Sequence, residues 1–145
     1  MKTLRDLLDV KGHQVSSVSP DDMVYDALKL MADMNIGAVL VMDDKGRLAG
    51  ILSEWDYARK IVLRGHTSKD TPVSAIMTDK VICMSADKTI HECMALMTAD
   101  HIRHVPVIDE DRVIGVVSIG DVGQAIILDQ GFVIGQLERY IHGTR

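Results

Sequence analysis

The chain has 145 residues, a hydrophobic fraction of 47% and a net charge of −5 at pH 7. This hydrophobic content excludes a disordered chain, and the acidic charge, with one tryptophan, three tyrosines and one phenylalanine, argues against a general nucleic-acid-binding surface. No apolar run approaches the roughly 20 residues that span a bilayer, and residues 1–15 lack the long apolar core of a signal peptide, so we expect a cytoplasmic protein that does not enter membranes.

The first part of the chain predicts a complete structural unit. An extended segment at Val15–Val18 precedes a helix at Asp22–Asn35, where apolar residues recur at helical spacing. Two short apolar runs, Val39–Met42 and Leu48–Leu52, flank a polar turn and predict a hairpin. A second helix is expected to begin at Ser53.

A second unit with the same order of elements follows a polar linker, Gly65–Pro72. Its elements are an extended segment at Val81–Met84, a helix at Thr89–His101, hairpin strands at Val105–Ile108 and Val113–Val117, and a second helix that begins at Ser118. Beyond this unit, Phe132–His142 carries apolar residues at helical spacing and predicts a tail helix.

The two units are copies of one sequence pattern. They align at an offset of 66 residues, which becomes 65 after Gly46 is skipped, and polar as well as apolar positions match. We therefore predict an α/β (α+β) fold with two pseudo-symmetric repeats, each a small sheet packed with two helices. The predicted divisions are residues 1–72, 73–130 and a helical tail at 131–145. Such duplication also predicts a pair of related sites in a cleft between the repeats.

A glycine, a serine and an aspartate recur where each second strand meets its second helix. The two segments read Gly50-Ile-Leu-Ser53-Glu-Trp-Asp56 and Gly115-Val-Val-Ser118-Ile-Gly-Asp121. Serine followed three residues later by an acid is typical of a capping box, which only stabilises the helix. The same groups could hold a nucleotide, because a helix N-terminus and a hydroxyl bind phosphate and a carboxylate accepts two hydrogen bonds from a ribose diol. Helix caps need not be identical, so the recurrence of all three residues favours ligand binding.

These features resemble the paired cystathionine-β-synthase (CBS) domains, whose tandem is called a Bateman module. The similarity lies in the polar Ser/Pro/Asp start of the first helix, in the segment Ile102-Arg-His-Val-Pro-Val-Ile-Asp109, and in the Gly-x-x-Ser-x-x-Asp ending of both copies. The resemblance covers about Val15–Ala125 and is of the small, free-standing bacterial type.

By this resemblance, each nucleotide site takes its Ser-x-x-Asp motif from one repeat and its base-binding wall from the other. In the family the aspartate holds ribose hydroxyls, the serine approaches phosphate and the lead-in strand flanks adenine. One site would combine Ser53 and Asp56 with Val81, Cys83, Met84, Arg103 and His104. The other would combine Ser118 and Asp121 with Val15, Ser17, Val18, Gly37 and Ala38. Further candidates on the strands are Val39, Val105 and Pro106.

The two expected sites differ in charge. Arg103 and His104 stand where the first repeat has Gly37 and Ala38, and a guanidinium binds phosphate bidentately. We therefore expect the Asp56 site to bind a phosphorylated ligand more tightly than the Asp121 site. Trp55 departs from the family pattern, and its indole is expected either to stack on a base or to lie in a dimer contact.

The resemblance implies a regulatory module that is not an enzyme. It would bind an adenine nucleotide, with AMP preferred and ATP, ADP or NAD as alternatives, and signal energy or redox state to an unknown effector protein. The alternative from another class is a structural scaffold without ligand. We expect no bound metal: His101-x-x-His104 has tolerable spacing, but no carboxylate or thiol is fixed beside it, and the two cysteines lack metal-site spacing. We also expect a homodimer formed through apolar helix faces.

Overall fold

The computed structural model describes residues 2–129, which form two compact units. One unit is residues 15–81, and the other joins residues 2–14 to residues 82–129. Each unit contains one sequence repeat with a three-stranded sheet, so the predicted α/β class with two repeats is confirmed. The predicted tail helix at Phe132–His142 and the division at residues 131–145 lie outside the described residues.

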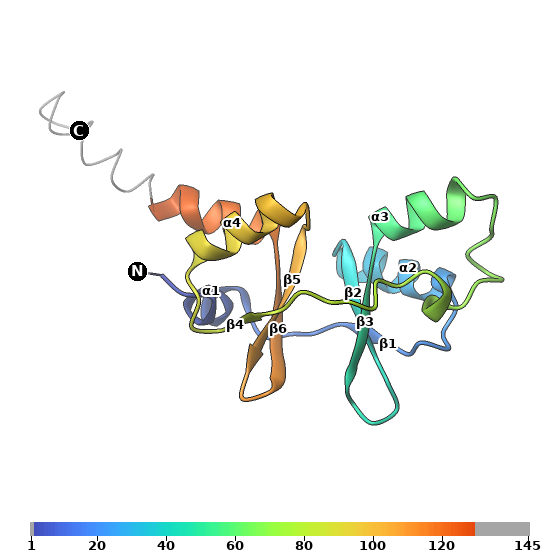
Figure 1. The fold of residues 1–145 in the computed structure, drawn as a ribbon, viewed down its shortest axis with the longest axis horizontal. Helices are drawn as coiled ribbons and strands as arrows, with labels where there is room; N and C mark the ends of the chain where they lie inside the picture. The colour runs from blue at the N-terminus through green and yellow to red at the C-terminus, as the bar shows by residue number, and fades with distance from the viewer. Residues whose placement is uncertain (1, 130–145) are drawn as a thin grey trace, which may run out of the picture. The chain divides into compact units, whose positions relative to one another are not determined.

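The sheet of the first unit has the order β1-β2-β3 (Figure 1). The lead-in strand β1 (Ser17–Val18) runs parallel to β2 (Ala38–Met42), and β2 pairs with β3 (Leu48–Ser53) as an antiparallel hairpin. Helix α2 (Val24–Met34) connects β1 to β2, as parallel neighbours require a crossover. Its helical pattern ends at Asn35, which adopts the left-handed conformation with φ 54°.

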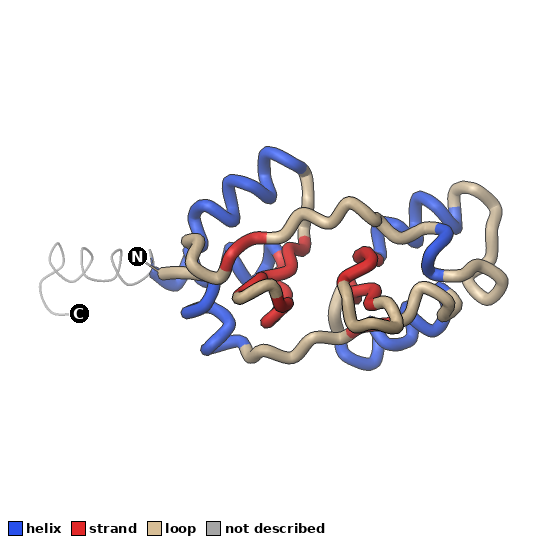
Figure 2. Tube along the Cα trace, turned by 60° about the horizontal axis from the view of Figure 1, so that its bottom comes forward, coloured by secondary structure: helices blue, strands red, loops and turns tan. Residues whose placement is uncertain are grey.

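The second predicted helix of this unit is short. Helix α3 (Glu54–Tyr57) passes into a π-helical turn, η1 (Ala58–Val62), and the chain then continues through loop and turn to a 3₁₀ turn, η2 (Val73–Ala75) (Figure 2). The apolar core of the unit combines Ile61 from η1 with buried residues of α2, β2, β3 and the segment around η2. The linker expected at residues 65–72 is therefore followed by residues that complete the first core.

The second unit repeats this arrangement. Strand β4 (Met84–Ser85) runs parallel to β5 (His104–Asp109), which pairs antiparallel with β6 (Arg112–Ser118). Helix α4 (Ile90–Asp100) forms the crossover and, like α2, ends at a left-handed residue, here His101 with φ 55°. Residues 119–129 are helical, so the helix predicted to begin at Ser118 is confirmed.

The one-residue gap in the alignment of the two repeats lies in the hairpin turn. In the second unit Glu110 and Asp111 both have positive φ, 49° and 62°, as a two-residue hairpin loop requires. In the first unit the turn is longer and includes Gly46 with φ 75°, while the Asp43 side chain accepts hydrogen bonds from the amides of Lys45 and Arg47. The extra residue therefore changes the turn but not the pairing of the strands beyond it.

An N-terminal helix, α1 (Leu4–Lys11), packs on the second unit although it precedes the first (Figure 1). A capping box of Thr3 and Asp6 starts the helix, and its buried side chains, Leu4, Leu7 and Leu8, enter the core with residues of α4, β5 and β6. Arg5 pairs with Asp87 and Asp109 at 3.1 and 2.9 Å. By its contacts, α1 thus belongs to the second unit, whereas the sequence division placed it with the first.

Within the described residues, no helix is both long enough and apolar enough to span a bilayer.

Candidate ligand-binding site

The Ser53 motif forms a closed local network. The Asp56 Oδ2 atom accepts hydrogen bonds from the Ser53 amide at 2.9 Å and from the Ser53 hydroxyl at 3.2 Å, and the Asp56 amide donates to Ser53 Oγ at 3.3 Å. Oδ1 faces the Lys60 ammonium at 3.2 Å and the Thr78 hydroxyl at 3.5 Å. The capping interpretation is therefore confirmed for this copy, and all four approaches to the carboxylate are taken.

The Ser118 motif has the same cap but a different outer partner. Asp121 Oδ2 accepts from the Ser118 amide at 2.8 Å, and the Asp121 amide donates to Ser118 Oγ at 3.0 Å. The Lys11 ammonium from the end of α1 also lies 2.6 Å from Oδ2 and donates to the Val116 carbonyl at 2.6 Å. Burial raises the pKa of Asp121, but the hydrogen bonds from Lys11 and Ser118 outweigh it and leave that pKa below its ordinary value.

The first amide of each helix is also bonded within the protein. The Glu54 amide donates to the Gly37 carbonyl at 3.0 Å, and the Ile119 amide donates to the Arg103 carbonyl at 2.8 Å. Because the serine oxygen takes a further amide in each copy, the helix N-termini offer fewer donors to a phosphate than the sequence predicts. An anion would therefore depend more on side chains than the sequence predicts.

The strand residues before each motif lie beside it in the same sheet. Ala38 is paired with Ser53, and His104 is paired with Ser118. Burial lowers the pKa of His104, and the nearby charges of Lys11 and Arg103 lower it further while Asp121 opposes them. A neutral imidazole, able to donate one hydrogen bond and accept another, therefore stands next to the second motif.

The other predicted wall residues divide between surface and core. Ser17 and Val18 form β1, Met84 begins β4, and Val15, Val81 and Cys83 lie in the extended segments before these strands. Three strand candidates, Val39, Val105 and Pro106, are buried in their own repeats. The combination of a motif from one repeat with a wall from the other stays a prediction.

Cys83 carries no sign of an activated thiol. Burial raises the pKa of its thiol, and it raises that of Cys93 to about 11. Both thiols are therefore protonated at neutral pH, as expected for cysteines that serve packing.

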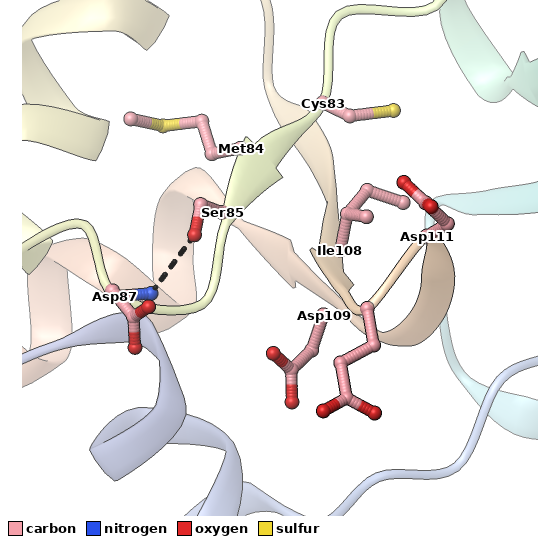
Figure 3. Close-up of a pocket in the computed structure, with 8 residues that line it drawn as sticks. Cys83, Met84, Ser85, Asp87, Ile108, Asp109 and Asp111 are labelled. Atoms are coloured by element: carbon pink, nitrogen blue, oxygen red, sulfur yellow. Dashed lines mark hydrogen bonds between the residues drawn. The ribbon is translucent and has the colours of Figure 1, made fainter.

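An open pocket of about 420 Å³ lies at the edge of the second sheet (Figure 3). Cys83 and Met84 line it, but so do four carboxylates, Asp87, Asp109, Glu110 and Asp111. Arg5 pairs with two of these acids but offsets only one negative charge, and the remaining negative charge would repel a phosphate. This pocket is therefore a poor candidate for an anionic ligand, in spite of the two predicted wall residues.

Trp55 is about half exposed, with 47% of its surface accessible, and the Arg59 guanidinium lies 4.4 Å from the centre of its ring. This cation–π contact holds the indole against its own helix. Stacking on a base and burial in a dimer contact both stay open as its role.

Sequence reasoning missed the two lysines. Lys11 lies before the aligned repeats, so the internal alignment does not reveal its contact. Lys60 stands where the second repeat has Ala125, and its spacing of four residues from Asp56 was the available signal. A signal for α1 was nonetheless present, because Thr3 and Asp6 have capping-box spacing and Leu4, Leu7 and Leu8 lie on one helical face.

A search of the described residues finds no group of three or more histidine, cysteine or acidic side chains that could hold a metal ion. The absence of a metal stays a prediction for the whole chain.

Comparison with known proteins gives a consistent match. The family model for the CBS domain matches twice, at residues 7–63 and 73–127. The chain is 40% identical to "CBS domain-containing protein CBSX3, mitochondrial" of Arabidopsis thaliana, over 97% of this chain and 72% of the relative.

Solved structures agree with this match. A protein with CBS domains from Burkholderia ambifaria MC40-6 is 45% identical and superposes with a TM-score of 0.84, over 89% of this chain and 96% of that one. A CBS domain pair of protein MJ0100, solved with 5′-methylthioadenosine and S-adenosyl-L-methionine, has a TM-score of 0.76 at 24% identity, over 87% of this chain and 96% of that one.

Proposed function

We infer that this chain, which belongs to the CBS-domain family, is a regulatory module that binds an adenine nucleotide and signals its presence to a partner protein. The observation that carries the proposal is the duplicated Ser-x-x-Asp network, in which each aspartate is fixed in place by its serine. A carboxylate held in this way is preorganised to accept hydrogen bonds from a ribose diol wherever its acceptor positions are open.

The chemistry of the ligand follows from the same groups. A ribose with two free hydroxyls suits a carboxylate, and the ammonium of Lys11 or Lys60 beside each aspartate favours an anionic group nearby. The solved pair that contains two adenosine derivatives supports an adenosine-containing ligand in this fold. AMP is our first choice, with ADP, ATP and NAD as alternatives, and the proposal assigns no reaction to the chain.

Calorimetric titration tests this proposal. We expect heat of binding with AMP, ATP or NAD and none with GMP at the same concentration. The double variant Asp56→Asn/Asp121→Asn should lose this heat, because both ribose acceptors lose their charge. Asp33→Asn, which changes an exposed carboxylate on α2, is the matched control and should bind as the original protein does. If no adenine compound binds at millimolar concentration, the module is a scaffold without ligand, which is the alternative function.

The signal would pass by a shift of population between conformations. A ligand that contacts both repeats would bind one relative orientation more tightly than others and would therefore favour it. The surface that an effector protein recognises would change with that orientation. The identity of the effector and the cytoplasmic location expected from the sequence stay predictions.

We also propose that the module acts as a homodimer. Each unit exposes apolar side chains on or after its second helix: Trp55, Val62 and Leu63 in the first, and Ile127 and Leu128 in the second. Burial of such side chains against a second copy would contribute about 25 cal/mol per Å² of apolar area before the costs of association.

Light scattering at micromolar concentration should therefore give twice the 16.0 kDa mass of one chain. Leu63, with 78% of its surface exposed, is a test position, and Leu63→Asp should shift the mass toward the monomer. Val10→Asp, at a position that is 86% exposed on α1, should leave the dimer intact. A monomeric mass for the unaltered chain would contradict dimerisation.

A further inference from the structure

The two motif carboxylates differ in how many hydrogen-bond acceptor positions remain open. A carboxylate has about four such positions, two on each oxygen. At Asp56 the Ser53 amide and hydroxyl take both positions on Oδ2, and Lys60 and Thr78 lie at Oδ1. A ribose diol could reach this carboxylate only if Lys60 and Thr78 moved away.

At Asp121 the partners gather on one oxygen. The Ser118 amide and the Lys11 ammonium both bind Oδ2, at 2.8 and 2.6 Å. Oδ1 has no hydrogen-bond partner among residues 2–129. Two hydroxyl donors can therefore bind at Oδ1 while every existing contact of the carboxylate is kept.

The exposure of the two side chains points to the same carboxylate. The Asp121 side chain is 27% exposed and that of Asp56 only 13%. The second motif thus offers two open acceptor positions on a more exposed carboxylate.

We propose that Asp121 binds the ribose of the ligand first, and that Lys60 and Thr78 keep Asp56 closed until they are displaced. This inference rests on the proposed function and adds an order of occupancy to it. The order is the reverse of the one predicted from Arg103 and His104 in the sequence, because a phosphate contact adds affinity only once the ribose acceptor is accessible.

Lys11 and Lys60 have opposite roles in this proposal. Lys11 approaches the oxygen that already accepts the Ser118 amide, so it keeps Asp121 ionised and leaves Oδ1 open. Lys60 is also bonded to the Ile76 carbonyl at 2.9 Å, which holds its ammonium on the oxygen of Asp56 that a diol would need. Lys60 is therefore a competitor of the ligand, and Lys11 is a positioning residue.

Titration of three variants with AMP tests the order. Asp121→Asn should weaken the tighter binding event at least about tenfold, the factor expected when a charged acceptor is lost, while Asp56→Asn should leave that event within about twofold. Lys60→Met keeps the apolar stem, removes the competing ammonium and should tighten the weaker event by about two- to tenfold. The isosteric Asn variants still accept the serine amide, so the caps and the fold are kept.

Amide NMR gives a readout on the unaltered protein. With AMP below saturation, the amide signals of Ser118 and Asp121 should shift before those of Ser53 and Asp56. A tight event that is lost in Asp56→Asn and kept in Asp121→Asn would overturn the order but leave the proposed function standing, and so would earlier shifts at Ser53. An unchanged weaker event in Lys60→Met would overturn the competing role of Lys60. Absence of binding by every adenine compound would instead defeat the proposed function itself.

Discussion

Replacement of Leu8 by alanine is expected to lower the free energy of unfolding by about 2–5 kcal/mol, the range for a buried leucine that leaves a cavity. Leu8 is 0% exposed and packs in the core of the second unit, with residues of α4, β5 and β6. Urea denaturation followed by circular dichroism measures the loss. Val10→Ala, on the same helix but at an 86% exposed position, is the control and should change stability by no more than about 0.5 kcal/mol.

Hydrogen exchange shows where this destabilisation acts. Because α1 packs on the second unit, Leu8→Ala should speed amide exchange in α4 and β6 more than in β2 and β3. Faster exchange confined to β2 and β3, or an unfolding curve equal to that of Val10→Ala, would contradict the assignment of α1 to the second unit.

Replacement of Gly50 by alanine is expected to cost about 1–3 kcal/mol, because the added methyl group overpacks a closed contact. A Cβ at this position would lie 2.7 Å from the Met77 sulfur and 2.8 Å from the Thr78 carbonyl oxygen. The sulfur can move, but the backbone oxygen is held by the bridge between Ile51 and Thr78. Thermal unfolding should therefore show a lower Tm for Gly50→Ala.

Gly123→Ala is the matched control for this substitution. Among residues 2–129 its Cβ would meet only the Met94 methyl group, at 3.8 Å, and position 123 is helical, where alanine is favoured over glycine by roughly 0.5–1 kcal/mol. We expect this variant to be at least as stable as the original protein. If Gly50→Ala and the control have equal Tm values, the backbone at Thr78 moves to accommodate the methyl group without loss of stability.

The recurring glycine has the same explanation in both repeats. At Gly115 a Cβ would lie 2.6 Å from a methyl carbon of Leu8, so the small residue admits α1 onto the second sheet as Gly50 admits the segment at Thr78 onto the first. The recurrence of this glycine, which the sequence suggested as part of a ligand motif, therefore has a packing cause.

The spacing of apolar residues was sufficient to predict most of the helices and strands of each repeat. The helices at α2 and α4 and the two hairpins lie within two residues of their predicted limits, because each buries a face whose apolar spacing matches its own geometry. Helix α3 was expected to continue as a regular helix, and instead it passes into a π-helical turn at Ala58–Val62 that places Ile61 in the core.

The sequence by itself determined the duplication, the family and the two Ser-x-x-Asp caps, because these depend on residues near one another along the chain. Only the tertiary structure decided which distant groups reach each carboxylate. Lys11 reaches Asp121 from 110 positions away, and Thr78 reaches Asp56 from 22 positions away. These two contacts follow from packing of whole elements, which local spacing does not encode. Lys60, by contrast, is four residues from Asp56 and stands where the second repeat has Ala125. Together these differences make two nearly identical motifs chemically different.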